Sequence, residues 1–247
     1  MHRDGQLTYL LIHGAWAGPW IWEQTAAHLS KAGHTVVVGD PLGQLEPGVD
    51  QVAETFETAM RRLTGLVDKI GGPLIAVGHS GGGVFASALA EARPDRIATL
   101  AYVAGFMLPS KTNYSEIAAQ QAPGWGIGPH LNWNAQQTTS QVPVEAAVEV
   151  FFHDCKPADA RATARCLTPF PEAVRSAAPV LTNAQFGRVP RVYIECIGDR
   201  SIPLAAQRQM QRLVPGARCI SLDCGHAPML ARPETFCAAL IELCEGS

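Results

Sequence analysis

The stretch "AVGHSGGGVFASALA", residues 76–90, places four glycines around Ser80 directly behind a short apolar run. A glycine-rich turn at the start of a helix exposes backbone N–H groups, and such groups bind negative charge. That charge can belong to the phosphate of a nucleotide, or to an oxyanion that forms only while Ser80 attacks a carbonyl group. The rest of the chain decides between these two interpretations.

Short apolar runs rich in β-branched residues alternate with longer helical patterns on both sides of this stretch. Continuous apolar runs are typical of parallel strands that helices cover on both faces. The pattern therefore predicts an α/β fold with a doubly wound, mostly parallel sheet. We expect strands at residues 7–14, 34–40, 73–80, 97–105, 191–199 and 217–225, and helices at about 20–32, 49–70, 82–92, 204–213 and 233–243.

The interval 106–189 breaks this alternation with prolines, scattered aromatic residues and polar runs such as "NWNAQQTTSQ". A structureless loop of that length is improbable inside a compact domain. We therefore expect a core formed by residues 1–105 and 190–247, and a cap insertion at 106–189. Several short helices of this cap are expected to lie over the carboxyl ends of the strands.

The length of 247 residues suits one well-buried domain with an insertion. Lys and Arg total 19 against 22 Asp and Glu, and no basic stripe of the kind that nucleic acid needs is present in the sequence. The apolar stretch behind Arg3 and Asp4 is too short for a secretory signal or a membrane span. We expect a cytoplasmic protein with no nucleic-acid or membrane partner, and the oligomeric state stays open, a homodimer included.

Seven cysteines form an odd set without the spacing of a disulfide-stapled domain, which indicates reduced thiols. Cys219, Cys224 and His226 come closest to a metal cluster. Alternation along a strand would send the two cysteines to opposite faces, however. The sequence therefore predicts neither a metal nor a cofactor.

A nucleotide site has one real match, because Gly81, Gly83 and Ala86 fit G-x-G-x-x-A behind a strand. A dinucleotide site also needs an acidic residue after the next strand to hold a ribose. That strand is followed by Phe106 instead, and no Lys-Ser or Lys-Thr pair follows Gly83 as in a phosphate-binding loop. These gaps favour the oxyanion interpretation.

The competing match is G-x-S-x-G at residues 78–82, a sharp turn that lifts the Ser80 hydroxyl above the sheet. A serine hydroxyl is a poor nucleophile at neutral pH, so it needs a histidine base and a carboxylate that orients the base. Asp199 and His226 follow the last two predicted strands, where a site at the carboxyl edge requires them. Weaker rivals for these two roles are Asp223, Asp154, His130 and His153.

An oxyanion needs two backbone donors. Gly81, the residue after the nucleophile, is predicted to supply one of them. The loop after the first strand supplies the other, and we assign it to Ala15 because His13 and Gly14 turn the chain and expose the next amide.

With "HGAWAGPWIW", "GHSGGG", "GDRSIP" and "GHAPMLARPE" in place, the chain resembles the α/β-hydrolase superfamily over nearly its whole length. It looks most like the branch that contains plant hydroxynitrile lyases, plant methylesterases and related bacterial esterases. The resemblance implies Ser80, Asp199 and His226 as the catalytic triad, with Ala15 and Gly81 as the oxyanion donors.

Within that branch the lyases carry a threonine after the first-strand histidine and a lysine after the catalytic histidine, where this chain has Gly14 and Ala227. Cyanide release needs a group that stabilises the leaving anion, and neither position supplies one. We therefore favour a serine carboxylesterase that acts through an acyl-enzyme. The alternatives are a hydroxynitrile lyase and a non-enzymatic small-molecule receptor.

The expected substrate is a small hydrophobic ester, such as a methyl ester of an aromatic acid or a carbamate methyl ester such as a benzimidazole carbamate. The aromatic residues of the cap and of the first turn are the natural candidates for contact with it. The candidate substrate-contacting residues are Gly14, Trp16, Phe106, Trp125, Trp133 and Phe152.

Overall fold

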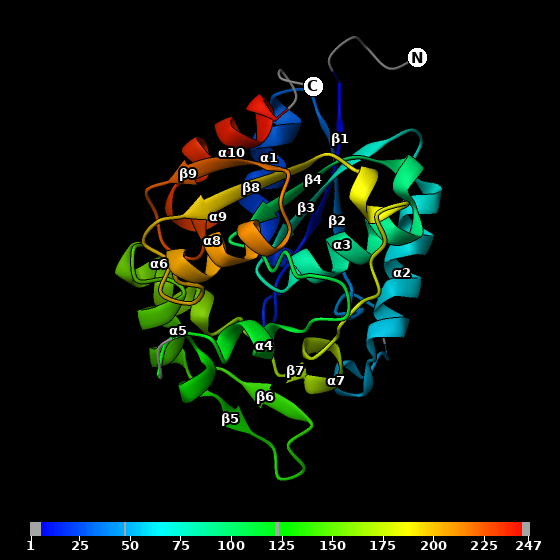
Figure 1. The fold of residues 1–247 in the computed structure, drawn as a ribbon. Helices are drawn as coiled ribbons and strands as arrows, with labels where there is room; N and C mark the ends of the chain where they lie inside the picture. The colour runs from blue at the N-terminus through cyan, green and yellow to red at the C-terminus, as the bar shows by residue number, and fades with distance from the viewer. Residues whose placement is uncertain (1–5, 47, 122–123, 244–247) are drawn as a thin grey trace.

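A six-stranded parallel sheet forms the centre of the protein (Figure 1). The computed structural model describes residues 6–46, 48–121 and 124–243. The strand order is β2-β1-β3-β4-β8-β9, and every neighbouring pair is parallel, which confirms the predicted fold class. The strands are β1 (Thr8–Ile12), β2 (Thr35–Gly39), β3 (Leu74–His79), β4 (Ile97–Val103), β8 (Arg191–Cys196) and β9 (Ala217–Leu222).

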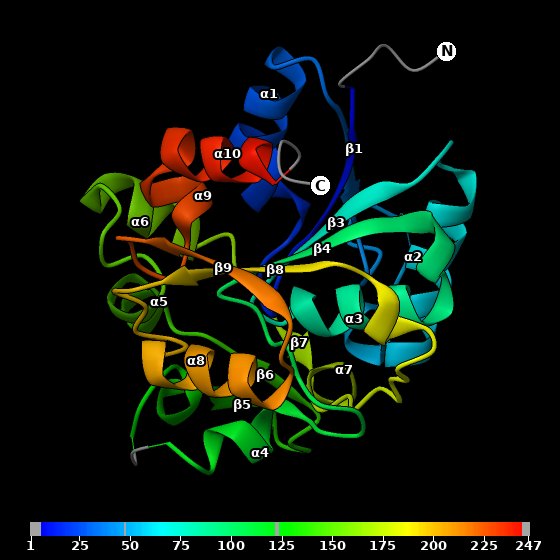
Figure 2. The same cartoon turned by 45° about the horizontal axis from the view of Figure 1, so that its top comes forward.

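Helices cover both faces of the sheet. Figure 2 shows α1 and α10 together on one side and α2, α3 and α8 on the other. Their apolar faces bury β1, β3 and β4 almost completely, so these strands need no polar outer face. The helices are α1 (Glu23–Lys31), α2 (Phe56–Lys69), α3 (Gly82–Ala92), α8 (Leu204–Leu213), α9 (Pro228–Ala231) and α10 (Pro233–Glu242).

Two predicted helices begin later than expected. The first opens as a 3-10 turn, Pro19–Trp22, before α1, and the second is preceded by a separate 3-10 turn, Gln51–Ala53. The cause in the second case is a capping box, in which the Thr55 side chain accepts a hydrogen bond from the amide of Thr58 and fixes the start of α2 at Phe56. Two further 3-10 turns, Pro94–Arg96 and Phe186–Arg188, lie in connections to strands.

The described part of the interval predicted as a cap, residues 106–189, is mostly irregular; most of it lies below the sheet in Figure 1, whereas its last residues run up beside α3. It contains the expected short helices, together with a small antiparallel sheet, β5-β6-β7, that was not expected. Strands of two or three residues carry no readable periodicity, which is why the sequence did not predict them. The elements are α4 (Tyr114–Ala118), a 3-10 turn (Gly128–His130), β5 (Asn132–Trp133), β6 (Thr139–Gln141), α5 (Val144–Val150), α6 (Pro157–Ala164), β7 (Phe170–Pro171) and α7 (Glu172–Arg175).

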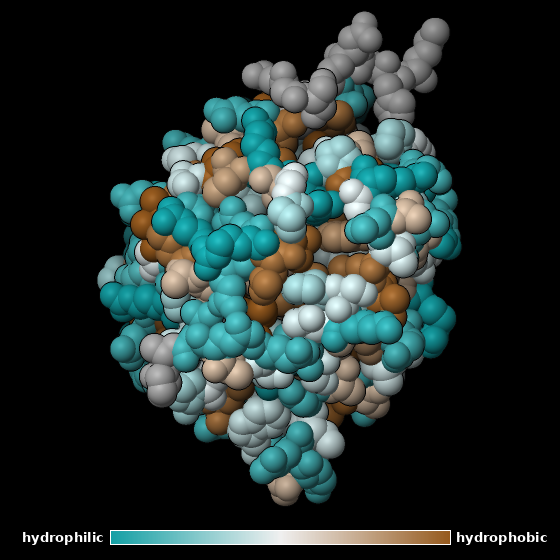
Figure 3. Space-filling view, in the orientation of Figure 1, coloured by the Kyte–Doolittle hydropathy of each residue, from teal (hydrophilic) through white to brown (hydrophobic). Residues whose placement is uncertain are grey.

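The face of the molecule in Figure 3 is largely hydrophilic, with apolar residues visible in patches between polar ones. Within the described ranges, no helix is both long and apolar enough to cross a membrane.

One buried carboxylate joins the elements at the β8 end of the sheet. Glu195 on β8 is 2% exposed and accepts hydrogen bonds from Arg208 Nη2 of α8 at 2.9 Å and from Ser221 Oγ of β9 at 2.8 Å. Arg208 holds the pKa of Glu195 down to about 2, against the opposing effect of burial. The ion pair thus ties α8 to the strands whose carboxyl ends lead to Asp199 and His226.

We predict that Glu195→Gln lowers the free energy of unfolding at pH 7 by about 1–3 kcal/mol, because the charge-assisted bonds to Arg208 are lost. The folded-state pKa is depressed, so the contribution of this charge is present above the ordinary value of 4.5 and is lost as the pH falls toward 2. Urea unfolding of both proteins at several pH values measures this. A stability difference that persists undiminished near pH 2 would contradict the assignment.

Candidate active site

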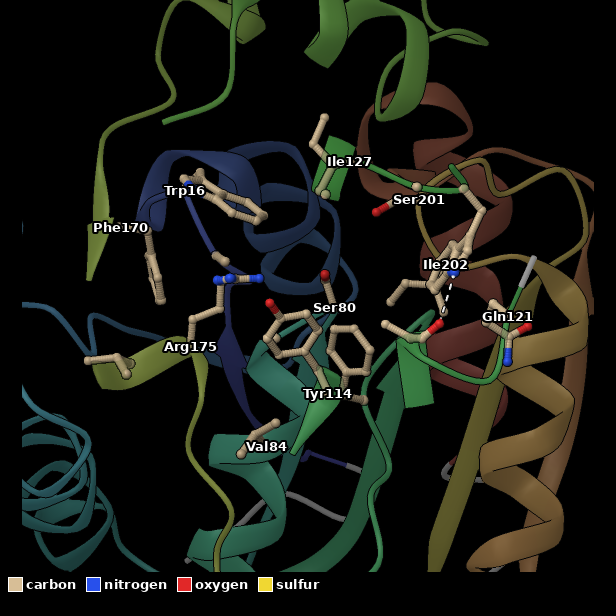
Figure 4. A pocket seen from close by; sticks show the side chains of 18 of the residues that line it. Trp16, Ser80, Val84, Tyr114, Gln121, Ile127, Phe170, Arg175, Ser201 and Ile202 are labelled. Carbon is tan, nitrogen blue, oxygen red and sulfur yellow. Dashed lines mark hydrogen bonds between the residues drawn. The ribbon is translucent and has the colours of Figure 1, made fainter. Parts of the chain in front are cut away.

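Ser80 occupies the turn between β3 and α3 with a backbone φ of 51°, in the left-handed region that residues with a side chain rarely adopt. Its amide donates to the carbonyl of Val103 at 3.1 Å, and its own carbonyl accepts from the amides of Gly83 at 3.1 Å and Phe106 at 2.9 Å. These bonds hold the strained turn in place. The hydroxyl therefore stands above the carboxyl edge of the sheet, as Figure 4 shows.

The turn closes because two neighbouring positions have no side chain. A Cβ on Gly82 would run into the carbonyl oxygen of Ile12 and lie 2.8 Å from that of His13. A Cβ on Gly14 would lie 2.7 Å from Ser80 Cβ. Glycine at both positions lets the loop after β1 pack directly against the serine.

Asp199 and His226 form a buried pair. Nδ1 of His226 donates to Oδ2 of Asp199 at 2.8 Å, and the two side chains are 4% and 0% exposed. The other carboxylate oxygen, Oδ1, accepts from the amides of Ser201 at 2.6 Å and Ile202 at 2.9 Å. The carboxylate is thus fixed at both oxygens, and it holds the imidazole with its proton on Nδ1 and Nε2 as the acceptor.

The rival carboxylates lie elsewhere. Asp223 is exposed, directly after β9. Asp154, in the interval between α5 and α6, accepts the amide of Gly225 at 2.7 Å through Oδ2. It therefore contacts the backbone before His226 and holds that loop.

Two ring contacts position His226 that the sequence analysis missed. Phe151 stacks on the imidazole with centroids 5.2 Å apart, and His79 lies 4.7 Å away. Nε2 of His79 donates to the backbone carbonyl of His226 at 2.8 Å. Burial keeps the pKa of His79 well below its ordinary value, with His226 adding to this effect, so the ring is a neutral donor at pH 7. The position of His79 in the sequence, at the end of β3 and next to Ser80, was the signal that could have identified it.

The amides of Ala15 and Gly81 meet at the base of the site. A Cβ on Gly81 would lie 3.3 Å from the nitrogen of Ala15. Neither amide donates a hydrogen bond to any residue that the structure describes. Unpaired N–H groups are rare in folded proteins, and a pair of them beside a serine hydroxyl can receive a developing negative charge.

A cavity of about 390 Å³ opens above Ser80, Gly81 and Ala15 (Figure 4). A narrower space of about 20 Å³ reaches from Ser80 to His226. Ser80 therefore lies where two spaces meet, one large and mostly apolar, and one small and lined by the imidazole.

The predicted substrate contacts divide between several places. Trp16, Phe106 and Trp125 line the large cavity, whereas Phe152 lines the narrow space beside His226. Gly14 lines neither space but lies against Ser80.

Trp133, on β5, is 41% exposed and lies outside both linings. Its position on a two-residue strand at the protein surface accounts for this. The structure adds lining residues that the sequence did not point to, among them Tyr114, Gln121, Phe170, Arg175 and Ser201.

Comparison with known proteins defines the class. A sequence model described as the alpha/beta hydrolase family matches residues 9–239. The chain belongs to this family, which confirms the predicted membership. Since the match spans the sheet and the cap interval, it covers every residue of the site described above.

Several relatives match over nearly full length. Methylesterase 7 of Arabidopsis thaliana is 26% identical over 261 residues, covering 99% of both chains. Salicylic acid-binding protein 2 of Nicotiana tabacum is 28% identical, covering 95% of this chain and 96% of its own. A pyrethroid hydrolase of Sphingobium wenxiniae is 27% identical, covering 96% and 87%.

Solved structures agree on the fold. Polyneuridine aldehyde esterase superposes with a TM-score of 0.83 at 20% identity, covering 96% of this chain and 99% of that one. A pyrethroid hydrolase from Sphingobium faniae has a TM-score of 0.83 at 25% identity, covering 98% of both.

The packing of the serine turn makes a prediction about stability. Gly82→Ala should lower the free energy of unfolding by about 1–3 kcal/mol, because the added methyl group forces two backbone carbonyls apart. Gly71→Ala is the matched control, since its Cβ would meet nothing within 4 Å. Urea denaturation of the three proteins measures the effect, and equal stability of both variants would contradict the close approach.

Proposed function

We propose that this protein is a serine carboxylesterase that hydrolyses a small hydrophobic ester through an acyl-enzyme. The observation that carries the proposal is the buried hydrogen bond between His226 and Asp199, placed at the edge of the space that Ser80 also lines. A base held in one tautomer by a buried carboxylate is what a serine nucleophile requires.

The proposed reaction has two halves. Nε2 of His226 takes the Ser80 proton while Oγ forms a bond to the ester carbonyl carbon, and the amides of Ala15 and Gly81 receive the oxyanion. The carbon–oxygen bond to the alcohol then breaks, and His226 returns the proton to the departing alcohol. Water repeats the attack on the acyl-enzyme, which releases the acid and restores Ser80.

For proton transfer, the Ser80 hydroxyl must first rotate toward His226. In this structure Ser80 Oγ makes no hydrogen bond to any described residue and stands at the large cavity. Both residues line the narrow space, and catalytic hydrogen bonds often tighten only when substrate is present.

The two spaces suggest how an ester sits. The leaving alcohol must lie beside His226, which protonates it, and the space of about 20 Å³ there suits a group of one or two heavy atoms, since a water needs about 10–15 Å³. The acyl part then occupies the large cavity with its aromatic walls. Methyl esters fit this arrangement, carbamate methyl esters included, and the names of relatives such as Methylesterase 7 and "Methyl jasmonate esterase 1" of Vitis vinifera agree with it.

The position after His13 favours hydrolysis over cyanohydrin cleavage. A side chain at Gly14 would collide with Ser80 Cβ, so the turn as built has no room for the threonine of the lyases. Ala227 is buried and offers no charge to a departing cyanide ion.

The proposed role of Ser80 leads to a prediction about activity. Ser80→Ala should lower kcat for p-nitrophenyl acetate by about 10⁴–10⁶-fold, because the nucleophile is lost while a single oxygen atom is removed. Ser30→Ala, at an exposed position on α1, is the control and should keep full activity. Mass spectrometry after treatment with a fluorophosphonate should find one adduct, on Ser80. Activity retained in a folded Ser80→Ala protein would disprove the proposal.

The role of Asp199 makes a second prediction. Asp199→Asn should lower kcat by roughly 10⁴-fold, because the amide would favour the wrong imidazole tautomer and could not stabilise imidazolium. The asparagine oxygen can still accept from Ser201 and Ile202, so the fold should persist. Asp223→Asn should behave like the wild-type enzyme. Steady-state kinetics with circular dichroism distinguishes the two, and a reversed order of effects would transfer the role to Asp223.

A further inference from the structure

Arg175 places a positive charge in the wall of the large cavity. It is the last residue of α7, its side chain is 11% exposed, and it lines the same cavity as Ser80. Among the lining residues that the structure describes, it is the only charged one. A cation in a mostly apolar cavity is costly unless it is paired, so its partners decide what it does.

The guanidinium group of Arg175 lies close to three aromatic rings. Its central carbon lies 4.3 Å from the ring centroid of Tyr114, 5.4 Å from that of Trp133 and 5.9 Å from that of Trp16. Rings above and below a guanidinium attract it through its faces and leave the N–H groups in its plane available. Trp133 does not line the cavity itself but lies near Arg175, which does.

One edge of the group is already paired. Nε donates to Oε2 of Glu172, one turn earlier on α7, at 2.6 Å. Glu172 does not line the cavity, and its side chain is 28% exposed. The Glu172 contact positions the side chain and engages Nε, and the Tyr114 hydroxyl is a second hydrogen-bond partner of the group, so the remaining N–H donors are those available to a ligand.

The other end of the group faces the cavity. Figure 4 shows the guanidinium nitrogens between Trp16 and Tyr114, turned toward the space in front of Ser80. Burial raises the pKa of Tyr114, with Glu172 adding to the rise, whereas the charge of Arg175 and its hydrogen bond to the Tyr114 hydroxyl oppose it, so Arg175 acts on a group that lines the cavity. Two terminal nitrogens with parallel N–H bonds match the two oxygens of a carboxylate.

We propose that Arg175 binds a carboxylate on the acyl part of the substrate, so that the natural substrate is a monoester of a dicarboxylic acid. This inference rests on the proposed esterase function. The aromatic walls and the volume of about 390 Å³ accommodate a benzene ring between the two carbonyl groups. Hydrolysis of such a methyl monoester consumes one water and yields the dicarboxylate, methanol and a proton.

The test compares charge at constant shape. The probes are the monomethyl esters of the three benzenedicarboxylic acids, each paired with the methyl ester in which a carboxamide replaces the carboxylate. For at least one isomer, wild-type kcat/KM should favour the carboxylate by about 10–100-fold, as expected for a charged group that pairs with a buried partner. Equal rates for all three pairs would overturn the proposal, because a guanidinium that only donates hydrogen bonds would hold the amide as well.

Variants assign the preference to one residue. Arg175→Met keeps the aliphatic stem and should abolish the preference mainly through KM, whereas Arg175→Lys should keep part of it through charge alone. Arg161→Met is the matched control, because Arg161 forms an exposed ion pair with Glu145 on the cap segment. A preference that survives Arg175→Met, or that disappears equally in Arg161→Met, would overturn the assignment.

A binding measurement separates this inference from the proposed function. Calorimetry with the Ser80→Ala protein and the preferred monomethyl ester needs no turnover, and adding Arg175→Met should weaken binding by about 10–100-fold. Carboxylate-dependent binding without any ester hydrolysis by the wild-type protein would keep the Arg175 site and reject the esterase. Hydrolysis of the neutral esters without carboxylate-dependent binding would do the reverse.

Discussion

The structure depends on the close approach of the loop after β1 to the turn that carries Ser80. That approach exists because Gly14 and Gly82 have no side chains where the two segments meet. Ser80 keeps its left-handed backbone through three hydrogen bonds, which join it to β4, to the first turn of α3 and to Phe106. The same contact brings the amides of Ala15 and Gly81 together, so one packing constraint determines both the exposure of the hydroxyl and the place where negative charge can be received.

The segment after β9 contributes the His226 imidazole, and several contacts hold it in place. Asp199 fixes its Nδ1 proton, Phe151 covers its face, and His79 holds its backbone carbonyl. Asp154 fixes the preceding residue from the cap interval. A side chain so constrained loses little freedom when a substrate binds, which is the physical content of a preorganised site.

The two spaces that meet at Ser80 differ in the groups that line them. His226 lines the narrow space, whereas Arg175 lies near aromatic rings in the wall of the large cavity, which is otherwise uncharged among the described residues. Under the proposed esterase function, the alcohol part of a methyl ester would occupy the narrow space, and a carboxylate on the acyl part would reach Arg175 in the large cavity. The charge of Arg175 would then set the orientation of the acyl part relative to Ser80.

The sequence by itself determined the sheet and the strand ends at which the candidate catalytic residues lie. Apolar runs separated by helical periods predicted the parallel strands, and the G-x-S-x-G match placed Ser80 at a strand end, because these patterns are local and need no knowledge of distant contacts. Asp199 and His226 followed from their places after two other strands, since the carboxyl ends of parallel strands share one edge.

Only the tertiary structure decided which groups meet. It paired His226 with Asp199 while leaving Asp223 exposed, put Trp133 near Arg175 instead of on the cavity wall, and assigned Asp154 to the backbone of Gly225. The cap interval has short elements without a period, so the direction of its side chains depends on packing against the core rather than on neighbours in sequence. Arg175 follows the same rule, because a single basic residue on a four-residue helix becomes a site only when the fold brings it to a cavity.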